Sequence, residues 1–186
     1  MLPTPAQTAE LIRNRRTIHA FKPGAPDAAA VEQAIELLRW APNHRITEPW
    51  RVYMLGTDTV ADVLDIAEKL TREKKGDAAA DAKRDKWNAV PQWLAVTQVL
   101  ADDKLQRQED YAACAAAIHN LQLYLWSEGI GVKWTTGPVI RSDEFLALLW
   151  SDPEAERAVG LLQLGYPAEV PVIPRKPVAD YLIKLP

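Results

Sequence analysis

The first stretch that could do chemistry is 15–21, which reads RRTIHAF. Arg15 and Arg16 are followed at once by the hydroxyl of Thr17, and His19 lies two residues further on. Guanidinium groups bind phosphate through paired, charged hydrogen bonds, and a neutral donor beside them completes such a site. The stretch therefore suits a phosphate, although these residues taken alone fit a solvated basic turn better.

The second candidate is 40–55, WAPNHRITEPWRVYML, where a patterned helix gives way to an apolar strand. Pro42 and Pro49 bracket a polar turn between the two. The stretch contains tryptophan, histidine, arginine and asparagine side chains. Keeping such a loop ordered costs conformational entropy unless something binds there. We expect a planar, negatively charged cofactor beside it.

Several common sites are excluded by their missing motifs. Gly129 and Gly131 are followed by Trp134 where a dinucleotide-binding GxGxxG needs its third glycine. The chain contains no GxxxxGK[ST] nucleotide loop and no GxSxG nucleophile elbow. Its three histidines fall at no metal-ligand spacing, and one cysteine cannot build a zinc site. Chemistry carried by a bound cofactor therefore stays open, whereas a side-chain nucleophile or a metal is poorly supported.

Composition sets broad limits on the function. The 186 residues are 48% hydrophobic and 25% charged, which is ordinary for a globular chain of about one domain. A net charge of −3 argues against a general nucleic-acid binder. The single cysteine allows no intrachain disulfide, and the first residues lack the apolar core of a signal peptide. We therefore expect a reducing, cytoplasmic location, with no apolar run long enough to span a bilayer.

Helices and strands alternate along the sequence. Apolar spacing predicts helices at 8–14 (capped by Thr8), 27–41 (capped by Asp27), 58–70, 109–129 and after Ser142. Apolar runs predict strands at 51–55, 93–100, 132–134 and 157–164, the first of them central in its sheet. The charge-dense segment 69–86 is interpreted as a solvated, mobile helical excursion, with a lid over a site as the alternative. The tail is extended, and 177–185 could add an edge strand, including to a partner subunit.

These elements predict an α+β or α/β three-layer sandwich with helices on both faces of a small sheet. The helix at 109–129 is small or apolar on every side around Cys114, so we expect it to be buried all round. Its small residues also permit close helix packing, so a dimer interface could run along it. Cys114 is interpreted as a core residue, and His119 with Asn120 as a satisfied buried polar pair.

Four segments resemble the nitroreductase family of flavin enzymes, in particular its small, minimal bacterial form. The stretch 15–21 is similar to the family's RRSxRxF opening, and 41–52 (APNH…EPWRV) to its APxxxxxQPWxF segment. KWTTG at 133–137 resembles the WRSG turn, and LGYP…PRKP at 164–177 resembles the GYP…RKP ending. The matches come in family order and span nearly the whole chain, so together they are specific.

The resemblance implies one FMN-binding domain over 1–186, with a small, mainly antiparallel sheet, a long buried central helix and an extended C-terminal tail. It also implies a homodimer with FMN at the subunit interface. Such enzymes pass a hydride from NAD(P)H through the flavin to a nitroaromatic, a quinone or a similar acceptor. By position, Arg15, Thr17 and Arg175 would hold the phosphate, with Arg16 and His19 near it. The remaining predicted flavin contacts are Asn43 and His44 from the opposite subunit, and Trp134, Thr135, Thr136 and Gly137 along the ring.

The sequence departs from the family pattern at several of these positions. His19 replaces a lysine or arginine, which predicts a weaker or pH-sensitive phosphate contact. Thr135 replaces the arginine of the turn, and Glu48 stands where glutamine is commoner. Three alternatives stay open: another acceptor, such as a halogenated aromatic, an enone or a flavin; a flavin-binding protein without catalysis; and a structural dimer in which the arginines are surface charge.

Overall fold

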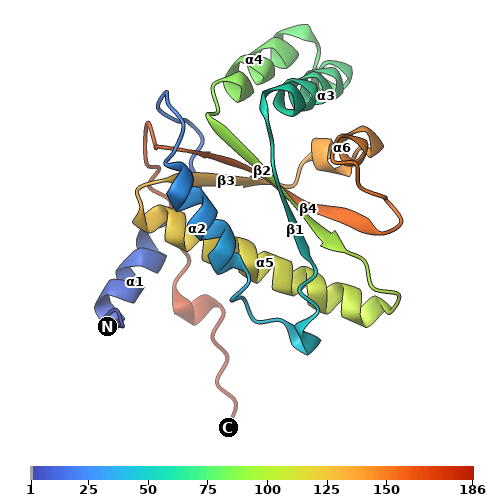
Figure 1. Ribbon diagram of the computed structural model, residues 1–186. Coiled ribbons are helices and arrows are strands. Elements are labelled where there is room, and N and C mark those ends of the chain that lie inside the picture. The colour runs from blue at the N-terminus through green and yellow to red at the C-terminus, as the bar shows by residue number, and fades with distance from the viewer. Residues whose placement is uncertain (1) are drawn as a thin grey trace.

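A four-stranded antiparallel sheet forms the middle layer of the computed structural model, which describes residues 2–186 (Figure 1). The strand order is β1-β2-β4-β3. The strands are β1 (Trp50–Met54), β2 (Gln92–Val99), β3 (Gly131–Thr135) and β4 (Glu156–Gly165). The central strands β2 and β4 are buried on both faces, which explains their nearly continuous apolar sequences.

One face of the sheet is covered by α2 (Ala28–Leu38) and α5 (Lys104–Ser127). The buried stripe of α2, which includes Val31, Ala34 and Leu38, packs with Ile118 and Leu121 of α5. Asp27 caps α2 by accepting a hydrogen bond from the backbone of Ala29, as predicted. This layer positions α5 directly beside the short edge strand β3.

The opposite face is covered by α3 (Thr57–Lys75), α4 (Asp77–Asn88), η2 (Pro138–Arg141) and α6 (Asp143–Leu148). Alternation along β2 sends Trp93 and Ala95 into this second core, whereas Leu94 and Val96 enter the first. Ser142 caps α6 through a hydrogen bond from the backbone of Phe145, as expected. The predicted α+β sandwich with helices on both faces is thus confirmed.

The segment 69–86 is helical, as predicted, but it forms part of a packed helical hairpin instead of a separate excursion (Figure 1). Ala80 and Trp87 of α4 are buried against α3, and Trp87 packs on Trp93 with ring centroids 5.2 Å apart. Arg84 bridges two carboxylates of α3, those of Asp65 and Glu68, each at 2.6 Å. The hairpin is attached to the sheet through Trp87 and through the buried face of α3, which includes Val63 and Leu64.

Other boundaries also differ from the expectations. Thr4, not Thr8, caps α1 (Pro5–Asn14), where a reciprocal hydrogen-bond pair with Gln7 forms a capping box. The first strand is an edge strand rather than a central one, since β1 pairs only with β2. The tail contains the short η3 (Val178–Asp180) instead of a strand and extends away from the body (Figure 1).

The long helix α5 is buried along one face only, which corrects the expectation of burial all round. Cys114, Ile118 and Leu121 are fully buried, whereas Tyr111 and His119 are exposed. His119 and Asn120 are therefore no buried pair. The small residues on the uncovered side leave room for another chain to approach. Within residues 2–186, no helix has the length and apolar character needed to cross a membrane.

Cys114 is expected to resist thiol reagents as long as the protein is folded. Burial, together with the nearby charge of Asp110, raises the pKa of its thiol to about 12. Only the thiolate is nucleophilic, so a neutral and buried thiol reacts slowly. Native protein at pH 8 should show almost no free thiol with a colorimetric disulfide reagent, and unfolded protein should show one per chain. Rapid labelling of the native protein would contradict this placement of Cys114.

Candidate functional site

Two of the predicted phosphate ligands, Arg15 and Thr17, follow the end of α1 and line one groove, and the charge of the third, Arg175, acts on Arg15. The helix ends at Asn14, and Arg15 turns out of it while its backbone N–H still donates to Leu11. Thr17 then pairs with Val132 in a parallel bridge, which fixes the segment against β3. Burial lowers the pKa of Arg15, and the positive charges of Arg16 and Arg175 lower it further. Arginines gathered at this density favour an anion between them.

A groove of about 440 Å³ begins at this arginine cluster. It is lined by Arg15, Thr17, Tyr111, His119, Gln122, Trp134 and Thr136. A second hollow of about 480 Å³ shares Tyr111 and Thr136 with it and continues toward Arg157 and Ile140. The two hollows make one trough between α5 and the end of β3. It has positive charge at one end and aromatic and hydroxyl groups along its length.

The turn after β3 is held rigidly by the neighbouring strand β4. The Nε1–H of Trp134 donates to the backbone oxygen of Val159 at 3.2 Å, and the Thr135 hydroxyl donates to that of Leu161 at 3.0 Å. The indole lies directly on Gly160, where a Cβ would come within 2.0 Å of Nε1. Thr136, which follows these anchored residues, lines the trough. Thr135 and Gly137 instead line a hollow on the α4 side.

Two predicted phosphate neighbours, Arg16 and His19, do not line this groove. Arg16 donates to the backbone oxygens of Arg13 and Arg15, so its guanidinium closes the end of α1. His19 lines a separate hollow with Lys86 and Glu169. Burial lowers the pKa of His19, and the charges of Lys133 and Lys86 lower it further. His19 therefore does not line the groove that Arg15 and Thr17 line.

Asn43 and His44 lie in a tight loop that contacts the N-terminal part of α5. The Asn43 side chain accepts a hydrogen bond from the backbone of Glu48 at 2.7 Å, and His44 Nδ1 lies 2.8 Å from a carboxylate oxygen of Glu109. Glu109 and His119 are separated by ten residues of helix, which is about 15 Å along the axis. Within this chain, the loop does not reach the arginine end of the trough.

This loop carries backbone strain. Arg45, Ile46 and Glu48 have φ values of 63°, 52° and 45°. The left-handed region is unfavourable for residues other than glycine, above all for a β-branched residue such as Ile46. Ile46 is also 80% exposed, so no packing within the chain explains its conformation. A strained, exposed loop of this kind is typical of a binding segment.

Sequence reasoning missed the wall that α5 contributes to the trough. Tyr111, His119 and Gln122 share one side of this helix, and their spacing of eight and eleven residues is compatible with one helical face. Burial lowers the pKa of His119, and the charge of Arg15 lowers it further. The helical spacing was a usable signal, but it was hidden by the expectation that every side of the helix was buried.

Comparison with known proteins decides the family. A sequence profile of the Nitroreductase family matches residues 12–166. This chain belongs to the nitroreductase family. The Bacillus subtilis protein named "Putative NAD(P)H nitroreductase YfhC" is 31% identical over 176 residues, which cover 92% of this chain and 90% of that protein. The Escherichia coli protein YdjA, named in the same way, is 24% identical and covers 85% of this chain and 87% of its own.

Solved nitroreductase structures have the same fold. A nitroreductase-like family protein from Bacillus cereus superposes with a TM-score of 0.85 at 27% identity, covering 100% of this chain and 99% of its own. A Desulfovibrio desulfuricans protein crystallised with FMN gives a TM-score of 0.78 at 20% identity, with the same coverage. The family resemblance found in the four sequence segments is thereby confirmed, and so is the nitroreductase-like α+β fold.

Proposed function

We propose that this chain is an FMN-dependent oxidoreductase that uses NAD(P)H to reduce a nitroaromatic, a quinone or a similar small acceptor. The observation that carries the proposal is a trough that Arg15 and Thr17 line together with Trp134 and Thr136, with the charge of Arg175 near enough to lower the pKa of Arg15. Membership of the nitroreductase family supports it, as does the name of the related YfhC. We infer that the FMN-binding domain comprises the whole chain.

The donor set of the trough fits FMN. The guanidinium groups of Arg15 and Arg175, with the Thr17 hydroxyl, would hold the dianionic phosphate through charged hydrogen bonds. The trough offers an aromatic side chain, Trp134, and a hydroxyl, Thr136, beyond the phosphate end. When bound, FMN would supply hydride transfer from the nicotinamide to the acceptor. The protein side chains would bind and orient it and exclude water, so no side-chain nucleophile is required.

We further propose that two copies of the chain form a homodimer whose interface completes the site. The uncovered face of α5 exposes Tyr111, and the strained loop exposes Ile46. Asn43 and His44 are far from the arginine cluster of their own chain, which agrees with a role in the site of the opposite subunit. On this proposal, dimer formation and FMN binding are coupled, so each should strengthen the other.

Addition of FMN to purified protein tests the cofactor assignment. We expect a yellow protein, or a colourless one that becomes yellow with FMN and gains several degrees in melting temperature. Binding to the folded state alone produces such a shift by mass action. Riboflavin, which lacks the phosphate, is the matched ligand control and should give a much smaller shift. A colourless protein whose melting temperature does not change when FMN is added would overturn the proposed function.

A further inference from the structure

The loop 43–48 is tied to α5 by a chain of hydrogen bonds that starts in its own backbone. The N–H of Glu48 donates to Asn43 Oδ1 at 2.7 Å, and Asn43 Nδ2 donates to Thr47 Oγ1 at 3.0 Å. The Thr47 hydroxyl donates in turn to Asp110 Oδ1 at 2.6 Å. The chain of donors therefore runs from the loop backbone to a carboxyl group on the long helix.

Asp110 is a buried end point for this chain. The residue is 2% exposed, and in the part of the chain that the structure describes no basic side chain forms an ion pair with it. Gln106, one turn earlier in α5, donates from Nε2 to the same Oδ1 at 2.9 Å. A buried carboxyl group is costly unless donors reach it. Because one of these two donors is Thr47, the carboxyl group and the loop stabilise each other.

The side-chain amide of Asn43 is used up inside the loop. Its Nδ2 donates to Thr47 and also to the backbone oxygen of His44 at 3.3 Å, and its Oδ1 accepts from Glu48. An asparagine amide has two hydrogens to donate, so none is left for a ligand. Asn43 therefore shapes the loop, and the expected flavin contact falls to His44, whose side chain is 59% exposed.

The backbone of the loop needs such a tie. Arg45, Ile46 and Glu48 all have positive φ, a conformation that residues other than glycine avoid. Ile46 is exposed, so its packing does not hold the backbone in this shape. A loop released from Asp110 is expected to relax into a less strained conformation, and His44 would then change its position.

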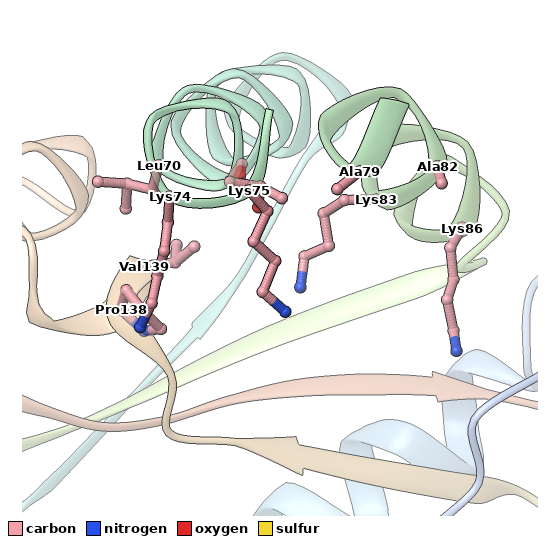
Figure 2. A pocket seen from close by; sticks show the side chains of 11 residues that line it. Leu70, Lys74, Lys75, Ala79, Ala82, Lys83, Lys86, Pro138 and Val139 are labelled. Atoms are coloured by element: carbon pink, nitrogen blue, oxygen red, sulfur yellow. The ribbon is translucent and has the colours of Figure 1, made fainter. Parts of the chain in front are cut away.

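The loop is separate from the lysine-lined cavity of the helical hairpin. That cavity, of about 440 Å³, is lined by residues of α3, α4 and η2, and its lysines point toward the sheet (Figure 2). The loop instead contacts α5, which covers the opposite face of the sheet. A change at Thr47 should therefore not reach the cavity, and its effect on cofactor binding can be assigned to the loop.

We propose that Asp110 is a positioning residue for the flavin site of the opposite subunit, because it fixes through Thr47 the loop that presents His44 to that site. The inference rests on the proposed function and on the proposed dimer. It adds a residue that acts on FMN binding without contacting FMN. When the Thr47 hydroxyl is removed, the loop relaxes and FMN in the opposite subunit loses its contact with His44.

Thr47→Val removes the hydroxyl and keeps a branched side chain at an exposed position, and Thr47→Ser is the matched control that keeps the hydroxyl. We expect Thr47→Val to bind FMN about tenfold more weakly, the loss that one hydrogen bond to a carboxyl group accounts for. Thr47→Ser should bind FMN as the unchanged protein does. In FMN-free protein, backbone hydrogen exchange within 43–48 should be faster in Thr47→Val and unchanged in Thr47→Ser.

Asp110→Ala tests whether Thr47 acts through Asp110. This variant should weaken FMN binding at least as much as Thr47→Val does. Adding Thr47→Val to it should cause no further loss, because the two residues share one hydrogen bond. Losses that multiply in the double variant would show that the two residues act separately, and they would overturn the role of Asp110.

Mixed dimers of a Thr47→Val chain and an Arg15→Ala chain show which site the loop serves. If the loop serves the opposite subunit, one site combines the Arg15 of the first chain with the unchanged loop of the second. Such a dimer binds one FMN with unchanged affinity. If each loop served its own chain, both sites would keep a defect and neither would bind FMN normally, which would overturn the proposal.

The failure of this proposal differs from the failure of the proposed function. Unchanged FMN affinity in Thr47→Val would reject the positioning role and leave the proposed function intact. An unchanged protein that does not bind FMN would reject the proposed function and the positioning role with it. In that case hydrogen exchange would still show whether Thr47 holds the loop.

Discussion

Replacing Arg15 with alanine is expected to weaken FMN binding by about 100-fold. Arg15 is half-buried, and its charge is destabilised by burial and by two neighbouring arginines. A phosphate dianion would relieve both effects through charged, bidentate hydrogen bonds. Titration of the FMN-free variant with FMN, followed by flavin fluorescence, measures the change in the dissociation constant.

Arg13→Ala is the matched control for this prediction. Arg13 precedes Arg15 by two residues, is exposed, and does not line the trough. Its backbone oxygen, which accepts the hydrogen bond from Arg16, is retained in the variant. The control should bind FMN as tightly as the unchanged protein does. Equal affinities for Arg15→Ala and Arg13→Ala would show that the phosphate assignment is wrong.

Gly160→Ala should destabilise the protein by about 2–4 kcal/mol and also weaken FMN binding. A Cβ at this position would come within 2.0 Å of the Trp134 Nε1 and 2.4 Å of its Cδ1. The indole would have to leave Gly160, and its hydrogen bond to the Val159 carbonyl would be lost. Because Trp134 lines the trough, displacing its indole would also disturb the proposed FMN site. Urea unfolding measures the loss of stability.

Gly56→Ala provides the comparison for the glycine variant. Gly56 has a φ of −79°, and a Cβ added there would have no neighbouring atom within 4 Å. Because Gly56 is the N-cap of α3, where alanine is less favourable than glycine, the variant should cost about 1 kcal/mol at most and leave FMN binding unchanged. If Gly160→Ala proved equally harmless, Trp134 would be free to move, and the turn after β3 would not be rigid.

Local sequence patterns predicted much of the fold. The helical spacing of Val31, Ala34 and Leu38 marked the buried face of α2, and Asp27 marked its start. Arg15 and Thr17 taken alone fitted a solvated basic turn better, and the family resemblance made them predicted phosphate contacts. Cys114 was correctly interpreted as a core residue.

Long-range packing explains what the sequence did not predict. The position of β1 at the sheet edge depends on strand order, which a single apolar run does not encode. The segment 69–86 looked solvated because Ala80 is its single buried residue, while the contacts that attach the hairpin come from Trp87 and from the earlier part of α3. His119 was assigned to the core because the faces of α5 cannot be distinguished before its neighbours are known.

Anaerobic titration of the FMN-loaded protein with NADH or NADPH is the decisive test of the proposed oxidoreductase function. We expect the long-wavelength flavin absorbance to bleach with one equivalent of reductant per flavin and to return when a nitroaromatic or quinone is added. Protein that binds FMN but keeps its absorbance in excess reductant would be a flavin-binding protein without this activity. That result would contradict the proposed function.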